Sequence, residues 1–445
     1  MTATNAARCE NTSQPDVSPA GGSLRRTISL RDFRLLLAGT STSLLGDQFA
    51  LIATPWLALQ LSNDPLALGI VLALEGIPRA VFMLVGGAVT DRVSPRTVML
   101  AADVTRGILT AAMAAVVLAG ATQMWMLYGF ALGFGLVAGF AVPAENSIVP
   151  MLVGRDDLQA GNAMIMGATQ LTSFVGPTLA GAVIASFSAS LLGIGLAFAV
   201  DTVTFAASAA TFALMRPQAA SAEPSPPAGL WASIRDGFVH LWEDDAMRFV
   251  FCVLAAVNLF VVGPLLVGIP LLAHQRLTSG AMAFGVLMGA FAAGNLAGYI
   301  LAGGTRPPSS TTMRIVVLGV LAGYGAVIVS LSFVTHAGLD ATLLAGLGAG
   351  NGYLALTLFT WIQARTPLEM LGRIMSLLTF ASLGLVSISQ AVAGAVGKWD
   401  LDALFVLSGG LVLGTTAVVA TRPGLRAFTD SLTESTSSHE KEPHQ

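Results

Sequence analysis

Carboxyl side chains that could take up and release protons lie inside long apolar runs of this sequence. They are Asp47, Glu75, Glu145 and Asp201. A charge surrounded by hydrocarbon is costly unless it faces a cavity or a partner, so each acid is a candidate for reversible protonation. Asp47 is the first choice, because it lies 13 residues, about 20 Å of helix, beyond Arg34 and has no basic residue one helical turn away.

A structural role is the alternative for these acids. Asp47 could be held by hydrogen bonds to a neighbouring helix near Gln48 or Thr54. Glu145 lies near the end of its run, where water can reach it and an ordinary ionised state is expected. Asp201 lies near the middle of its run and is equally consistent with contacts between helices.

Two pairs of opposite charge occur at helical spacing. Glu75 and Arg79 are four residues apart, and Asp103 and Arg106 are three apart. Each pair therefore shares one face of a helix and can neutralise itself, which favours a static role. The alternative is a gate, in which these charges exchange partners as the protein changes conformation.

A short charged turn separates two of the apolar runs. Gly87 precedes it, and Asp91, Arg92 and Arg96 lie in it. Both flanking runs are long enough to cross a bilayer and the turn is only a few residues long. The two helices must therefore return on the same side, with these charges at the membrane surface.

The spacing Gly-x-x-x-Asp-Arg-x-x-x-Arg in this turn resembles the loop between the second and third helices of the major facilitator superfamily of secondary transporters. The resemblance implies that Gly87 lets helices approach closely. It also implies that Asp91 and Arg92 take part in a cytoplasmic latch that locks and releases during alternating access. The family usually has Gly and a basic residue where this chain has Ser94 and Pro95.

Further stretches make the chain look like the branch of proton-coupled exporters that includes macrolide-efflux and enterobactin-exporter-like proteins. The similarity extends from Phe33 to about Arg422. It includes part of the family's antiporter motif at Gly176, Pro177 and Gly181, although the full motif has two further glycines that are replaced here. The resemblance implies antiport.

Composition indicates the same class of protein. Of 445 residues, 54% are hydrophobic and 11% charged, and the mean hydropathy is +0.75, which a soluble domain of this size could not carry on its surface. The two cysteines suggest neither a disulfide nor a metal site, and the charges are too scattered for a nucleic-acid surface. No cofactor or enzymatic site is expected. Because no nucleotide-binding turn is present, the energy should come from an ion gradient.

Twelve membrane spans result when the chain is divided at its polar and Pro/Gly-rich breaks. The predicted spans are 34–61, 66–90, 97–120, 123–150, 159–186, 190–214, 248–272, 280–303, 313–334, 339–363, 371–396 and 401–421. The sequence thus predicts an all-α integral membrane protein made of two six-helix bundles. A short match supports two repeats, because Gly181 and Gly394 occupy similar surroundings in the fifth and eleventh spans.

The domain boundaries follow from these spans and from changes in composition. We expect a disordered tail over 1–28, an N-terminal bundle over 29–215, a linker with an interfacial amphipathic helix over 216–247, a C-terminal bundle over 248–422 and a disordered tail over 423–445. Eighteen basic residues fall on the side of both tails and two on the other. The positive-inside rule then places both termini in the cytoplasm and the protein in the inner membrane.

The predicted function is proton-coupled export of small hydrophobic organic compounds, such as drugs or natural products. The partners are that substrate, protons and the lipid bilayer, without nucleic acid, and a monomer is expected. A siderophore or lipid carrier of the same build is an alternative. A non-transporting membrane receptor or assembly factor is an alternative of another class, against which the turn after Gly87 and the buried Asp47 argue.

Overall fold

The computed structural model describes residues 20–90, 92–154, 157–187, 190–216, 230–305, 309–333, 336–366 and 368–439, nearly all of them helical. Twelve of the described helices are long and apolar enough to cross a membrane. The expected all-α fold with twelve spans is therefore confirmed, and the predicted boundaries differ from the observed ones by a few residues.

Six spans form the N-terminal half, behind a short first helix. The helices are α1 (Ala20–Ser29), α2 (Arg31–Ser62), α3 (Pro65–Thr90), α4 (Pro95–Leu118), α5 (Met124–Leu152), α6 (Leu158–Ala185) and α7 (Leu192–Leu214). Within this half α3 packs on α5, and α7 packs on both α2 and α4.

The C-terminal half holds the other six spans, the first of which is interrupted by a π-helical turn. Its elements are α8 (Leu230–Glu243), α9 (Asp245–Val257), η2 (Asn258–Val262), α10 (Gly263–Gln275), α11 (Gly280–Gly304), α12 (Ser310–Ser330), α13 (Ala337–Arg365), α14 (Leu368–Trp399), α15 (Leu401–Thr421) and α16 (Pro423–His439). Here α11 packs on α13, and α12 packs on α15.

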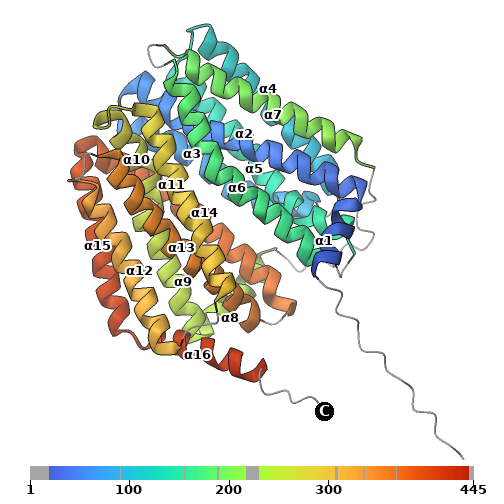
Figure 1. Cartoon of the computed structure of the whole chain (residues 1–445), viewed down its shortest axis with the longest axis vertical. Coiled ribbons are helices and arrows are strands. Elements are labelled where there is room, and N and C mark those ends of the chain that lie inside the picture. Colours follow the sequence, from blue (N-terminus) through green and yellow to red (C-terminus); the bar gives the residue numbers. More distant parts are fainter. Residues whose placement is uncertain are drawn as a thin grey trace, which may run out of the picture.

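The molecule has two ends that differ in how the halves meet (Figure 1). We call the end that carries α1, α8 and α16 the tail side. The opposite end, with the connections at Asn63–Asp64 and Ala119–Gln123, is the loop side. Figure 1 shows the halves meeting toward the loop side and diverging toward the tail side.

Glycines bring the halves together at two equivalent places. A methyl group added at Gly181 of α6 would lie 3.0 Å from the Cα of Gly285 in α11, and one added at Gly394 of α14 would lie 2.9 Å from the Cα of Gly69 in α3. These glycines let the helix backbones touch, as small residues commonly do in membrane helices. The similar surroundings of Gly181 and Gly394 in sequence thus match equivalent positions at the interface.

Short helices cover the tail side. The first, α1, is tied to the start of α6 by the ion pair Arg26–Asp157 (2.6 Å). The last, α16, lies where the sequence predicts a disordered tail, but its Leu425 and Phe428 are buried. Phe428 packs edge-on against Trp361 of α13, with ring centroids 4.9 Å apart. Tertiary contacts therefore hold a segment that its polar composition alone would leave unfolded.

Candidate functional site

Arg106 of α4 lies at the centre of a cluster of carboxyl groups in the N-terminal half. Its guanidinium is 3.4 Å from Glu145 of α5, 3.6 Å from Asp103 of its own helix and 3.8 Å from Asp47 of α2. The side chains of Arg106 and Asp103 are only 5% and 3% exposed, whereas those of Asp47 and Glu145 are 30% and 40% exposed. One guanidinium thus lies close to three carboxyl groups, and two of these carboxyl groups are partly exposed.

Asp201 of α7 lies beside this cluster and is fully buried. Neither of its carboxylate oxygens has a hydrogen-bond partner among the described residues. Gly46 allows this arrangement, because a methyl group at that position would overlap Asp201 Oδ1 and the hydroxyl of Thr204. The absence of a side chain at Gly46 therefore brings α7 against α2 next to Asp47.

The aromatic ring of Phe205 helps to position Arg106. Its guanidinium carbon lies 5.1 Å from the ring centroid of Phe205 on α7, and Phe205 packs edge-on against Phe134 of α5 at 6.0 Å. A guanidinium over an aromatic face gains a cation–π attraction, which is stronger away from water. The ring and the acids together fix the cation between α2, α4, α5 and α7.

Glu75 and Arg79 form the pair expected from their spacing, with Oε1 and Nη2 2.8 Å apart. They line a hollow of about 140 Å³ between the two halves, opposite Phe284 and Met288 of α11 and Leu383 of α14. Arg79 Nε has no hydrogen-bond partner among the described residues. The pair therefore presents polar groups to a mainly apolar space.

The charged turn is described only in part. Asp91 lies outside the described residues. Arg92 is exposed, while Arg96 donates hydrogen bonds to the carbonyl oxygens of Phe212 and Ala213, both at 2.7 Å, at the end of α7. An arginine at a helix C-terminus satisfies carbonyls that have no partner within the helix. Arg96 thus joins α4 to α7 within one half.

The close helix approach expected at Gly87 occurs one residue earlier. A methyl group at Gly87 would meet nothing within 4 Å, whereas one at Gly86 would lie 2.6 Å from the carbonyl oxygen of Gly139 in α5. The one-residue shift changes the helix face that carries the contact.

The antiporter-like residues of α6 lie at helix contacts. A methyl group at Gly176 would lie 2.5 Å from the Cβ of Gln48 in α2, so this glycine sets the packing next to Asp47. Pro177 and Gly181 face Gly285 of α11, in the other half. The motif therefore links the candidate proton site to the interface between the halves.

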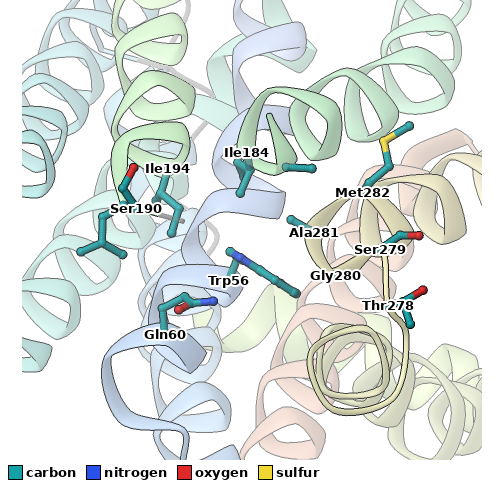
Figure 2. A pocket seen from close by; sticks show the side chains of 12 residues that line it. Trp56, Gln60, Ile184, Ser190, Ile194, Thr278, Ser279, Gly280, Ala281 and Met282 are labelled. Carbon is teal, nitrogen blue, oxygen red and sulfur yellow. The ribbon is translucent and has the colours of Figure 1, made fainter. Parts of the chain in front are cut away.

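The loop side is closed by contacts between the halves. Lys398 Nζ of α14 lies 2.9 Å from Asp64 Oδ2, after α2. The hydrogen bond and charge of Lys398 hold the pKa of Asp64 below its ordinary value, although partial burial opposes this. The Trp56 and His274 rings meet edge-on at 5.3 Å. Figure 2 shows Trp56 beside Gly280 and Ala281, in a hollow of about 560 Å³ lined by both halves.

The shared position of Arg106 is the feature that sequence reasoning missed. The sequence pairs Arg106 with Asp103, but its contacts with Asp47 and Glu145 depend on how three helices pack. A second missed residue is Asp340 in the first turn of α13, which is fully buried. It lies near the start of a predicted span, where an acid is ordinary, so no sequence signal marked it. No group of side chains in the described ranges is arranged to hold a metal ion.

The sequence model of a known family matches nearly the whole chain. The family is described as transmembrane secretion effector, and the match covers residues 25–444.

Among curated proteins, the chain is similar to bacterial enterobactin exporters. It is 27% identical over 354 residues to the enterobactin exporter EntS of Citrobacter koseri, with 78% of this chain and 80% of that protein covered. The identity to EntS of Escherichia coli (strain UTI89) is 26% over 354 residues, with the same coverage.

Solved transporter structures have the same fold. The nucleoside transporter NupG superposes with a TM-score of 0.66 at 13% identity, covering 90% of this chain and 99% of that one. A bacterial homologue of the iron transporter ferroportin, in an inward-facing state, gives 0.67 at 17% identity, with 88% and 99% covered.

Proposed function

The chain belongs to the transmembrane secretion effector family of the major facilitator superfamily, and from this premise we propose that it exports small hydrophobic organic compounds in exchange for protons. It is a secondary transporter and a multi-pass protein of the inner membrane. The coupling ion, the direction of transport and the kind of substrate are the proposed part.

The single observation that carries proton coupling is the excess of acids around Arg106. With Asp47, Asp103 and Glu145 ionised, the four groups would have a net charge of −2. Such an excess is costly in a low-dielectric interior and tolerable next to water. A cluster of this kind can take up a proton from water on one side of the membrane, hold it while sealed, and release it when it opens to the other side, which is what an antiporter requires.

Asp47 is the proposed proton carrier. Its contact with Arg106 is the longest of the three, and its Oδ1 has no hydrogen-bond partner among the described residues. It is also partly exposed, whereas Asp103 is nearly buried. Asp47 can therefore change its protonation without breaking a tight hydrogen bond, while Asp103 keeps Arg106 in place.

The halves provide the alternating access that coupling needs. Their contacts lie on the loop side, at Asp64–Lys398 and at the two glycine pairs. With both termini in the cytoplasm, as the distribution of basic residues favours, this conformation is closed to the outside. A substrate would enter from the cytoplasm as the proton leaves, and the opposite conformation would release it and take up a proton.

The lining of the hollow between the halves supports the proposed kind of substrate. Its walls are mainly apolar, from Leu51, Phe284 and Met288, with Glu75 and Arg79 as its charged groups. A sugar or phosphate would need more hydrogen-bonding or basic side chains. A hydrophobic molecule with one polar or charged group suits this lining, and methionine can adapt to different shapes.

Transport by the purified protein in proteoliposomes tests the proposal. Ethidium, erythromycin and enterobactin serve as probes, with and without an imposed pH gradient, and a pH-sensitive dye records proton movement. We expect at least one probe to accumulate only with the gradient and to move protons when added alone. Accumulation that is the same with and without the pH gradient would overturn proton coupling. An absence of transport for all three probes would overturn the proposed kind of substrate.

A siderophore carrier is the second candidate, because enterobactin exporters are similar over 78% of the chain. In the same assay, selective transport of enterobactin, with neither ethidium nor erythromycin moved, would favour this candidate over a drug exporter.

A further inference from the structure

A long hollow on the outer surface of the C-terminal half plays no part in the proposed transport. Its volume is about 880 Å³, and it lies where α9, α15 and the start of α16 meet on the tail side. Cys252 and Val253 of α9 line one wall, and Gly410, Gly414 and Val418 of α15 line the other.

The hollow is lined by two helices that are long and apolar enough to cross a membrane, α9 with its continuation and α15, and its lining is exposed where a bilayer would surround them. Cys252 is exposed, and so is Val418, at 51%. Gly410 and Gly414 are one helical turn apart, and a methyl group added at either would meet nothing within 4 Å. Two missing side chains therefore leave a groove along α15 whose lining is apolar and which a hydrocarbon chain could fill.

Positive charge gathers at the tail-side end of the groove. Arg248 and Arg422 both line it. Arg248 is paired with Asp245, at 2.5 Å, whereas the Arg422 guanidinium has no ion pair with any residue that the structure describes. Two cations and one acid leave a net charge of +1, which complements a single phosphodiester.

Aromatic side chains mark the depth of this end in the membrane. Trp242 of α8 lines the groove and stacks on Phe238, with ring centroids 5.1 Å apart. Both are exposed, at 43% and 41%. Exposed aromatic residues of an amphipathic helix lie at the level of the lipid headgroups. The arginines beside them are therefore at headgroup height.

The length of the groove matches one leaflet. Gly410 lies 12 residues before Arg422, about 18 Å along a helix, and half of a bilayer's hydrocarbon core is about 15 Å. We propose that this groove binds one anionic phospholipid, with its phosphate at Arg422 and Arg248 and an acyl chain along Gly410 and Gly414.

Native mass spectrometry of the purified full chain tests this site. The probes are dioleoyl phosphatidylglycerol and dioleoyl phosphatidylcholine, which have the same chains and differ in net charge. Arg422→Ala removes a cation, and Gly414→Leu fills the groove. The matched controls are Arg25→Ala, which removes another exposed tail-side arginine, and Gly319→Leu, which adds the same side chain at an exposed glycine of α12 with open space around it.

We expect one phosphatidylglycerol to be retained about 5-fold more tightly than phosphatidylcholine, because one cation near a membrane contributes about 1 kcal/mol. Arg422→Ala should remove this preference. Gly414→Leu should weaken the binding of both lipids. Neither control substitution should change the binding of either lipid. Inorganic phosphate at 10 mM, about the concentration of an ordinary buffer, should not displace the lipid.

Three results would overturn the proposal. One is equal binding of the two lipids that Arg422→Ala does not alter. Another is an equal effect of Gly414→Leu and Gly319→Leu, which would indicate non-specific contact with surrounding lipid. The third is displacement by inorganic phosphate, which would indicate a simple anion site. Melting temperatures of the variants exclude unfolding as the cause.

Discussion

Asp47 of α2 faces Arg106 of α4, with Oδ2 and Nη1 3.8 Å apart. Asp47 has no cation within one turn of it on α2, so its pairing depends on how a second helix is placed. Asp103, by contrast, is on the same helix as Arg106 and keeps its pairing whenever α4 moves as a rigid body. A shift of α2 relative to α4 would change this distance, and the protonation of Asp47 would then report the conformation of the N-terminal half.

Arg106→Gln should destabilise the protein by about 3 kcal/mol, because it leaves the buried Asp103 without its cation. The double variant Asp103→Asn/Arg106→Gln should recover part of this loss, since it removes the most buried of the acids. Thermal unfolding in detergent measures both effects. A single variant as stable as the parent would show that the cluster does not need its cation.

Gly135→Ala should lower the melting temperature strongly, because the added methyl group would overlap the carbonyl oxygen of Glu75 in α3. Gly129→Ala, on the same helix, is the matched control. A methyl group there meets nothing within 4 Å, and alanine is the better helix former by about 1 kcal/mol in soluble hosts. Equal effects of the two substitutions would contradict the packing of α5 on α3.

Asp244→Ala should cost about 1 to 2 kcal/mol, since Asp244 caps the N-terminus of α9 and pairs with Arg365 at 2.7 Å. Partial burial raises the pKa of Asp244, but hydrogen bonds from Arg365 and two backbone N–H groups outweigh it, and the pKa is lowered overall. The stabilisation is therefore present above about pH 4, the ordinary pKa of an aspartate, and is lost as pH falls further.

Unfolding at pH 7 and pH 5 checks this account, with Asp245→Ala as the control, because that side chain is 74% exposed. The difference between Asp244→Ala and the parent should be the same at both pH values. A difference that grows as the pH falls from 7 to 5 would mean that the pKa of Asp244 is raised above its ordinary value and not lowered.

Asp64→Asn should weaken closure of the loop side. The pair with Lys398 joins the two halves and is partly exposed, so its loss should reduce the ratio of closed to open molecules about 2- to 5-fold. Spin labels at Gln60 and Thr278, on opposite walls of the hollow in Figure 2, measure that population. Asp402→Asn is the control, because it breaks a pair with Arg276 within one half.

The same labels give the pH dependence of closure. Because Lys398 holds the pKa of Asp64 below its ordinary value, the pair's contribution is present above about pH 4 and disappears as pH falls through the lowered pKa. The closed population of the parent should therefore be equal at pH 7 and pH 5. An increase in closure as the pH falls from 7 to 5 that Asp64→Asn abolishes would contradict the assigned pair, because it would mean that closure raises the pKa of Asp64.

The sequence was sufficient to predict the twelve spans and the close pairs within a helix, because both depend on local spacing. Hydropathy marks each span, and residues four apart, such as Glu75 and Arg79, share a face on any helix. The equivalence of Gly181 and Gly394 could also be recognised, since the two repeats place similar residues at the same interface.

Two features could not be predicted: the position of Arg106 among three acids, and the helix faces that make the close contacts. Both depend on the rotation of each helix and on which helices are neighbours. Arg106 reaches Asp47 and Glu145 only after α2, α4 and α5 have packed. A rotation by one residue likewise decides that Gly86, and not Gly87, meets α5. The helix α16 was missed for the same reason, as Phe428 is apolar but its partner Trp361 is distant in sequence.

Transport by Asp47→Asn tests the central claim most directly, since this side chain is almost unchanged in size but cannot release a proton. In proteoliposomes with an imposed pH gradient, the variant should no longer accumulate a substrate that the parent accumulates. It should still exchange labelled for unlabelled substrate without a gradient, because the hollow and the contacts between the halves are untouched. If Asp47→Asn concentrates the substrate against its gradient as well as the parent does, Asp47 does not carry the proton and the account is contradicted.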